Sequence, residues 1–125
     1  MASFEKHIEK YGLFKKDAEN KTVSHMSRIE AYFFASFHLI EAVMAKHDKH
    51  INKHTMLRSF LAKENDIFKE DTEIVWRDFQ TIENQIRPGQ EYGGKINGEE
   101  LKRANELFEE IRSICNKALK QQNSI

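Results

Sequence analysis

Residues 87–94 of the chain read RPGQEYGG and bring together side chains that could bind a phosphate-bearing ligand. The guanidinium of Arg87 can form two parallel hydrogen bonds with a phosphate, and the ring of Tyr92 can stack on a nucleobase or donate a hydrogen bond. In the alternative interpretation, Arg87 pairs with Glu91, and Tyr92 closes one end of a helical core. The first interpretation makes Arg87, Glu91 and Tyr92 candidate ligand-binding residues, whereas the second makes them structural.

Three histidines in the middle of the chain are of a type that binds metal ions. His47, His50 and His54 are spaced three and four residues apart and would share one face of a continuous helix. Asn52 lies between them and is a good helix N-cap, which predicts a helix break within the set. Surface histidines among lysines are also common. These three residues are therefore metal candidates only if one helix carries all of them.

His38 and Cys115 are two further reactive side chains with ordinary structural interpretations. His38 lies beside an apolar helix face, where a histidine is either hydrogen-bonded to a neighbouring helix or active in proton transfer. Cys115 is the single cysteine, so it cannot form an internal disulfide, and its apolar neighbours indicate a packing role. A nucleophilic pair of Cys115 and His38 would require the two to meet, which nothing in the sequence predicts.

Helices must position these side chains, and the longest is predicted over residues 22–51. Its apolar residues recur at steps of three and four, which places them on one face of the helix. A stripe of this length and breadth must be covered by other helices. The stripe consists of Met26, Ile29, Phe33, Phe37, Ile40 and Met44.

Two short helices are predicted on either side of this long one. Ser3 can cap a helix that covers Phe4 to Tyr11 and ends at Gly12, because glycine readily adopts the left-handed conformation of a helix stop. After Asn52, a second short helix carries the apolar residues Met56, Leu57, Phe60 and Leu61.

Two longer helices are predicted in the second half of the chain. One begins at about Glu70 and ends at Arg87-Pro88, because the residue before a proline avoids the helical conformation. Asn97 can cap the other. Their buried faces are Val75, Phe79, Ile82 and Ile86 in the first, and Leu101, Ala104, Leu107, Phe108, Ile111, Ile114, Cys115 and Ala118 in the second.

Composition agrees with one helical domain. The chain has 125 residues with only 5 glycines and 1 proline, and its 20 basic residues balance 20 acidic ones. Proteins that bind nucleic acid through its phosphates usually have a basic excess, which this chain lacks, so any RNA or DNA contact would be local. We predict an all-α fold, an up-and-down antiparallel four-helix bundle with a short additional N-terminal helix. We expect a single domain over residues 1–125 with its core at about 22–119.

The localisation expected from the sequence is cytoplasmic. No apolar run is long enough to span a bilayer, and the first residues lack the apolar core of a signal peptide. We expect no membrane association and no cofactor.

Several short motifs, in this order and spacing, resemble the HEPN superfamily over about residues 26–114. The first is Ser27-Arg28 leading into the string FFASFH of residues 33–38. His54 then opens the next helix, and Arg87 with Glu91-Tyr92-Gly93 precedes the last one. The likeness is closest to the small stand-alone members of that superfamily.

The resemblance implies a bundle of four or five helices, commonly a homodimer and often encoded with a small nucleotidyltransferase partner. Many members act as toxins, in toxin–antitoxin pairs, or in RNA-directed defence. Active members are metal-independent ribonucleases in which an arginine stabilises phosphate charge and a histidine soon after it transfers a proton. Here Arg87 matches the arginine, but no histidine follows it in the chain, and Tyr92 stands where one would be sought.

Three functional hypotheses follow. The first is a non-catalytic HEPN-like protein that binds a nucleotide, RNA or a nucleotidyltransferase partner through Arg87, Glu91, Tyr92, His38 and His54. The second is a ribonuclease in which His38 or His54 supplies the missing histidine to Arg87. The third is a structural, dimeric interaction module.

Overall fold

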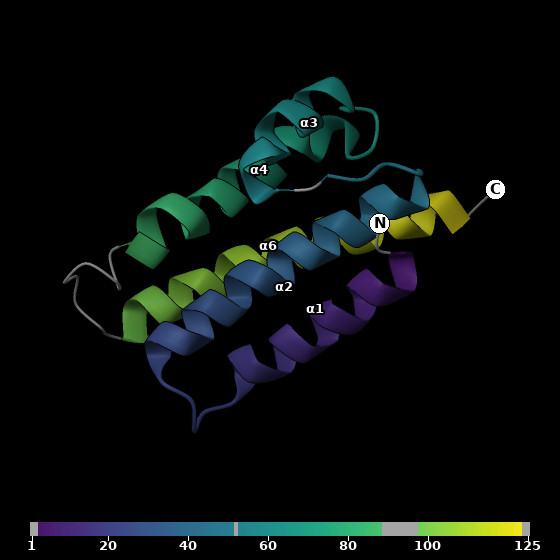
Figure 1. The fold of residues 1–125 in the computed structure, drawn as a ribbon. Helices are drawn as coiled ribbons and strands as arrows, with labels where there is room; N and C mark the ends of the chain where they lie inside the picture. Colours follow the sequence, from purple (N-terminus) through teal and green to yellow (C-terminus); the bar gives the residue numbers. More distant parts are fainter. Residues whose placement is uncertain (1–2, 52, 89–97, 124–125) are drawn as a thin grey trace.

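The computed structural model describes residues 3–51, 53–88 and 98–123, with side chains in the last range described up to Lys120. Every regular element in these ranges is helical, which confirms the predicted all-α class. Figure 1 shows long helices lying side by side along their lengths, with a group of shorter helical segments over one side. None of the described helices is long and apolar enough to cross a membrane.

Helices α1 (Phe4–Glu19) and α2 (His25–Lys46) form an antiparallel pair joined by a short turn (Figure 1). The hydroxyl of Ser3 caps α1 by accepting a hydrogen bond from the backbone N–H of Lys6, and Ser24 caps α2 through the N–H of Ser27. The cap at Ser3 was expected from the sequence. Both caps satisfy backbone donors that a helix N-terminus otherwise leaves unpaired.

Helix α6 (Gly98–Asn123) lies against α2 and runs in the same direction (Figure 1). Helix α1 covers one side of α2, while α4 (Thr72–Thr81) packs against α6 and also contacts α2. The 3₁₀ turns η1 (His54–Met56) and η2 (Lys69–Asp71) flank the short helix α3 (Leu57–Lys63), which packs on α4. Helix α2 is therefore enclosed from several directions.

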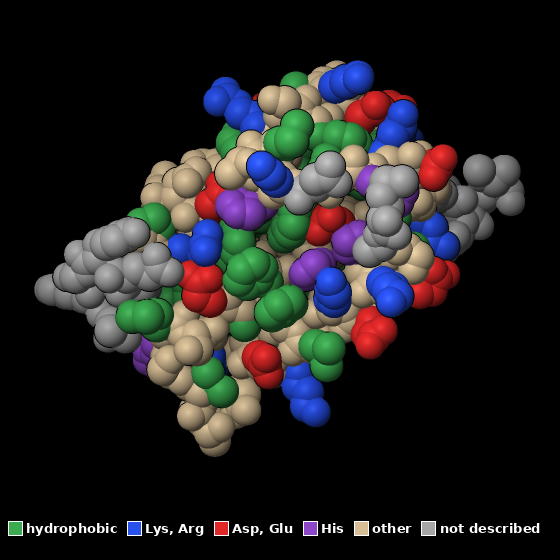
Figure 2. All heavy atoms as spheres, viewed as in Figure 1, with side chains coloured by type: hydrophobic (Ala, Val, Ile, Leu, Met, Phe, Trp, Pro, Cys, Tyr) green, Lys and Arg blue, Asp and Glu red, His purple; other side chains and the backbone are tan. Residues whose placement is uncertain are grey.

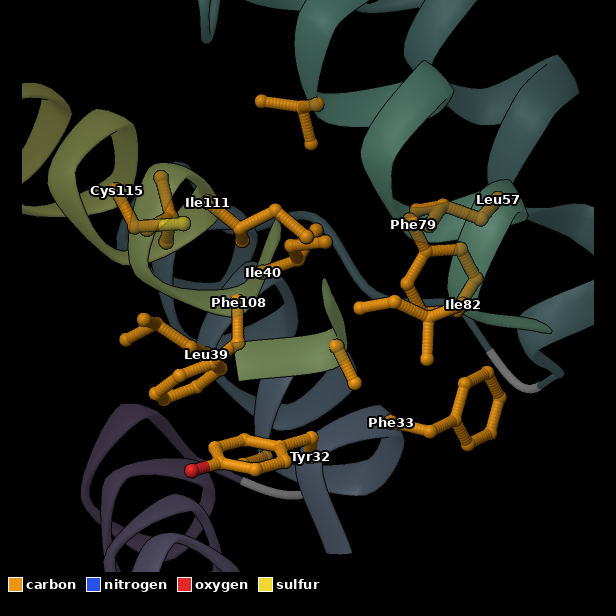
Figure 3. Packing of buried hydrophobic residues seen from close by; sticks show 14 of the residues in the cluster. Tyr32, Phe33, Leu39, Ile40, Leu57, Phe79, Ile82, Phe108, Ile111 and Cys115 are labelled. Atoms are coloured by element: carbon orange, nitrogen blue, oxygen red, sulfur yellow. The ribbon is translucent and has the colours of Figure 1, made fainter. Parts of the chain in front are cut away.

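The aromatic residues of α2 point toward different neighbours. Phe33 lies beside Phe79 of α4, with ring centroids 5.2 Å apart, and Tyr32 lies 5.3 Å from the ring of Phe108 in α6 (Figure 3). Twelve of the 22 residues of α2 are buried, more than a single stripe can supply. Four residues of the predicted stripe, Ile29, Phe33, Ile40 and Met44, are buried, and the other two, Met26 and Phe37, are half-buried.

The prediction of a short N-terminal helix that ends at Gly12 is wrong, because α1 continues to Glu19. Glycine inside a helix costs only about 1 kcal/mol, which tertiary packing can offset. That packing comes from Ala18, which is fully buried, and from Phe14, whose ring lies 5.2 Å from that of Phe34. The hydrophobic core thus includes residues that precede position 22.

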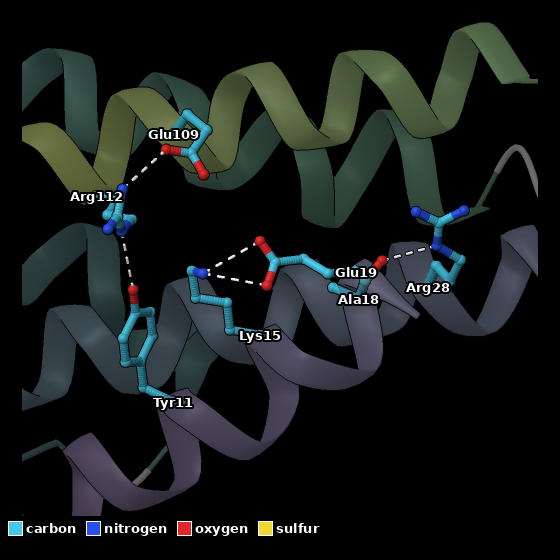
Figure 4. A network of polar contacts seen from close by, with 7 residues as sticks. All are labelled: Tyr11, Lys15, Ala18, Glu19, Arg28, Glu109 and Arg112. Atoms are coloured by element: carbon cyan, nitrogen blue, oxygen red, sulfur yellow. Dashed lines mark hydrogen bonds and ion pairs between the residues drawn. The ribbon is translucent and has the colours of Figure 1, made fainter. Parts of the chain in front are cut away.

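Polar contacts also link α1 to α2 and α6 (Figure 4). The Nε of Arg28 in α2 donates to the backbone oxygen of Ala18 at 2.7 Å. The Nε of Arg112 in α6 donates to the hydroxyl of Tyr11 at 3.1 Å. Helix α1 is thus an integral layer of the fold.

The chain does not leave the helical conformation at Arg87-Pro88, contrary to the sequence prediction. A π-helical segment, η3 (Ile82–Ile86), follows α4, and Arg87 and Pro88 are still helical after it. Proline lacks an N–H and crowds the carbonyl four residues back, which here belongs to Asn84. The wider π turn contains that carbonyl and accommodates the proline without ending the helix.

Most of the predicted buried faces of the later helices agree with the structure, while Phe60, Leu107 and Ile114 are only half-buried. Val75, Phe79, Ile82 and Ile86 are all fully buried, as is Cys115 in α6. Met56, expected in the core, is 55% exposed because it lies in the η1 turn before α3 begins. Asn52 and Asn97, the expected caps, lie outside the described residues.

A carboxyl group is buried where α4 meets α6. Asp78 has a fully buried side chain, and its Oδ1 accepts two hydrogen bonds of 3.2 Å from Arg77, which also pairs with Glu110 of α6. Its Oδ2 has no hydrogen-bond partner among the described residues. Burial, reinforced by the neighbouring Glu110, raises the pKa of Asp78 to about 7.

We predict that Asp78→Asn stabilises the protein at pH 8 but not at pH 5. The ordinary pKa of this carboxyl is 3.8, so between about pH 4 and 7 the folded form holds a proton that the unfolded form lacks. Its contribution to stability therefore falls as the pH rises through this window. We expect the variant to gain about 1 to 3 kcal/mol in unfolding free energy at pH 8, measured by urea denaturation.

Glu73→Gln, which removes an exposed carboxylate from the same helix, is the matched control. It should change the unfolding free energy equally at both pH values. An Asp78→Asn effect that does not vary between pH 5 and pH 8 would contradict the prediction.

Candidate functional site

Arg87, the arginine singled out in the sequence, lies on an aromatic ring of α2. The Cζ of its guanidinium is 3.9 Å from the centroid of the Phe33 ring, a distance typical of a cation–π contact. Its Nε donates to Oε1 of Glu30 at 2.9 Å. Both side chains of this ion pair are partly buried, with 20% and 27% of their surface exposed. Stacking and hydrogen bonding together fix the plane of the guanidinium.

His54 approaches the same ring from the η1 turn. Its imidazole lies edge-on to Phe33, with centroids 5.3 Å apart and the planes at 88°, and in a similar arrangement to Phe37. Its Nδ1 is hydrogen-bonded to a carboxylate oxygen of Glu83 in η3. A carboxylate in this position orients the imidazole.

Two helix segments supply the partners of Arg87 and His54. Glu30, Phe33 and Phe37 are spaced three and four residues apart on α2, so they share one face. Glu83 and Arg87 are four residues apart, about one turn, at the end of the segment that begins with α4. The crossing of α2 with this segment therefore brings Arg87 and His54 to the same ring.

Two carboxylates lie at this Arg87–His54 site. Glu30 pairs with Arg87, and Glu83 pairs with His54. Figure 2 shows histidine side chains across the middle of this face of the molecule, among hydrophobic, basic and acidic neighbours. A phosphate bound to Arg87 would therefore lie near the negative charge of Glu30.

His38 lies in a different cluster, between α1 and α2. Its Nδ1 is 3.3 Å from Nδ1 of His7 and 3.5 Å from Oε1 of Glu41, and Nε2 of His7 is 3.6 Å from Oε2 of Glu41. Phe14 of α1 stacks on the His38 ring, with centroids 5.6 Å apart and planes at 6°. His38 is thus hydrogen-bonded to a neighbouring helix, one of its two predicted roles.

Burial controls the protonation of this His7–His38–Glu41 cluster. Burial and the adjacent His7 lower the pKa of His38 to about 4, while burial raises the pKa of Glu41 to about 7. The pKa of His7 is also lowered, chiefly by burial and then by the positive charge of Lys10. Both imidazoles are therefore neutral at physiological pH.

The structure brings together some of the residues predicted from the sequence and separates others. Arg87 and His54 meet at Phe33, whereas His38 faces His7 and Glu41. Glu91 and Tyr92 lie outside the described residues.

The metal candidates His47, His50 and His54 do not form a group within the described ranges. Helix α2 ends at Lys46, so no single helix carries the three. His50 lies 3.8 Å from Asp48, and His54 faces Glu83. The one group of three or more metal-ligand types found among the described residues is His7, His38 and Glu41.

Sequence reasoning missed four residues of these two sites: Glu30, Glu83, His7 and Glu41. His38 and Glu41 are three residues apart on one helix, a spacing that places two ligands on the same face. That signal was available in the sequence. The partnership with His7 was not, because it depends on how α1 packs against α2.

Comparisons with protein-family models, with curated proteins and with solved structures find no match to this chain.

We predict that the Arg87–Glu30 pair contributes measurably to stability. A double-mutant cycle of Arg87→Ala and Glu30→Ala should give a coupling energy of about 1 kcal/mol, because both side chains are partly shielded from water. The unfolding free energies would be measured by chemical denaturation.

The control cycle is Arg112→Ala with Glu109→Ala, an ion pair whose side chains are 41% and 45% exposed. Its coupling should stay below about 0.5 kcal/mol. Equal coupling energies in the two cycles would count against a fixed Arg87 guanidinium.

Proposed function

We propose that this chain is a non-catalytic, HEPN-like helical protein that binds a phosphate-bearing ligand, a nucleotide or RNA, through Arg87 and His54. The proposal includes the up-and-down four-helix arrangement, the homodimer, the cytoplasmic location and the nucleotidyltransferase partner that the HEPN resemblance implies. A toxin–antitoxin or defence setting would suit such a protein. The resemblance supplies the class of ligand, and the geometry of Arg87 and His54 supports the choice of site.

The observation that carries the proposal is the shared contact of Arg87 and His54 with Phe33. The two residues are 33 positions apart in the chain, yet both touch one ring. The bond to Glu30 uses Nε of Arg87, and the terminal amino groups of a guanidinium are well suited to bidentate phosphate binding. A guanidinium and an imidazole that border one ring could both contact the same phosphate.

The charges of the chain favour binding of one local phosphate over a long nucleic-acid footprint. The chain has no net charge, and Nε of Arg87 is already bonded to Glu30. A phosphate on the terminal amino groups of Arg87 would be repelled by this nearby carboxylate. Removing the charge of Glu30 should therefore strengthen binding.

We predict opposite effects from the two partners of the ion pair. Arg87→Ala should weaken the binding of a nucleoside triphosphate or a short RNA by at least about tenfold, because it removes a charge-assisted contact. Glu30→Gln should strengthen it. Titrations monitored by NMR would give both affinities and also locate the ligand.

Arg103→Ala is the matched control, since it removes an exposed arginine from α6. It should leave the affinity unchanged. If nucleotides and RNA move no resonance of Arg87 or His54 in the wild-type protein, the proposal fails.

A ribonuclease is the second candidate function, and the pairing of His54 with Glu83 favours it. A carboxylate-bound imidazole is the arrangement that enzymes use to orient a general base. His54 thereby becomes the histidine that could stand in for the one absent after Arg87. His38 suits this role less well, because it faces His7 and Glu41.

If the chain is a ribonuclease, it will cleave RNA without added metal and leave a cyclic phosphate. His54→Gln and Arg87→Ala should each abolish cleavage, since the imidazole moves the proton and the guanidinium stabilises the phosphate charge. Electrophoresis of a labelled RNA would measure this, with His25→Gln as the control histidine. RNA that stays intact after long incubation with wild-type protein would eliminate this second candidate.

A further inference from the structure

We propose that His7, His38 and Glu41 bind a divalent transition-metal ion, with Zn²⁺ the best fit, and that the ion joins α1 to α2. The site is separate from Arg87 and His54, and it does not depend on the proposed function. Its three ligand-type side chains come from two helices that are packed along each other.

Two separations around His38 match those of a tetrahedral ion. Bonds of about 2.0 to 2.2 Å from zinc to nitrogen or oxygen place neighbouring ligand atoms about 3.3 to 3.6 Å apart. Nδ1 of His38 lies 3.3 Å from Nδ1 of His7 and 3.5 Å from Oε1 of Glu41. One ligand atom from each of the three residues lies within 4.8 Å of the other two, so a small movement of the side chains would complete the site. His7 faces His38 with Nδ1 and Glu41 with Nε2, so the ion would take one of its two ring nitrogens.

The ligands are held in place before any ion binds. His7 is 6% exposed and Glu41 is 9% exposed, and the ring of Phe14 stacks on His38. Side chains packed in this way lose little conformational freedom on binding, which favours affinity. Three protein ligands also leave the fourth position of a tetrahedron for a water molecule or an exogenous ligand.

The donor set points to zinc and its neighbours in the first transition row. Two imidazole nitrogens and one carboxylate oxygen suit Zn²⁺, Co²⁺ or Ni²⁺, whereas Mg²⁺ and Ca²⁺ prefer oxygen ligands throughout. A buried carboxylate without a cation is costly, and the ion would offset this cost.

Lys10 opposes cation binding. It lies one turn after His7 on α1, and its positive charge acts on His7, His38 and Glu41 alike. The lysine is exposed, so solvent and salt weaken its repulsion. Lys10→Gln should therefore tighten metal binding modestly, by a factor of about 2 to 5.

The test uses the full chain, freed of metal with a chelator and titrated with Co²⁺ at neutral pH. Tetrahedral Co²⁺ with nitrogen and oxygen ligands absorbs visible light strongly, and we expect these bands to appear at one equivalent and to vanish on adding Zn²⁺. His7→Gln, His38→Gln and Glu41→Gln should each weaken Zn²⁺ binding by more than about 100-fold, since even outer partners of metal ligands are worth 10- to 100-fold. His25→Gln, at the far end of α2, should leave affinity unchanged.

A second measurement uses the wild-type protein, so it tests the proposal even if the variants fail to fold. In wild-type protein with ¹⁵N-labelled histidines, Zn²⁺ should shift the ring nitrogens of His7 and His38 but not those of His25 and His47. If Co²⁺ gives no tetrahedral bands, or if Zn²⁺ leaves the His7 and His38 signals unmoved, the cluster is a hydrogen-bonded polar contact and the proposal is overturned.

Discussion

The burial of α2 is the constraint on which the rest of the structure depends. Its aromatic and aliphatic side chains point in several directions, so one neighbouring helix cannot remove them from water. Helices α1, α4 and α6 all contact it, and each brings apolar residues to a different side. Because hydrophobic burial is the largest favourable term in folding, the other helices take positions that cover α2. The polar side chains must then fit around that packing.

Both polar sites lie where charged groups meet the aromatic residues of α2. Phe33 supports Arg87 and His54, while Phe37 lies between His54 and His38, with ring centroids 6.0 and 5.9 Å away. The two sites are thus separate in their polar contacts but share an aromatic boundary. A ligand that shifted Phe37 at one site would also displace side chains at the other, because packed interiors transmit small displacements.

Carboxylates that are partly or fully buried recur in this fold, and their charges are compensated in different ways. Glu30 and Glu83 have basic partners, whereas Glu41 lies with two neutral imidazoles and Asp78 keeps one oxygen without a hydrogen bond among the described residues. Burial without full pairing is costly, and native proteins rarely retain it without a reason. For Glu41, a bound cation would be such a reason. The Asp78 oxygen instead marks a place where stability is lost at neutral pH.

The sequence by itself determined the helical class, most of the apolar face of α2, the cap at Ser3, and most of the buried residues of α4 and α6. These follow from periodicity and local hydrogen bonding, which involve residues only a few positions apart. Tertiary structure alone decided that α1 continues past Gly12, because burial of Ala18 and Phe14 outweighs the local stop signal. It also decided that His54 contacts the same Phe33 ring as Arg87, whereas His38 contacts His7. Those pairings depend on the crossing of distant helices, and no local pattern in the chain encodes such a crossing.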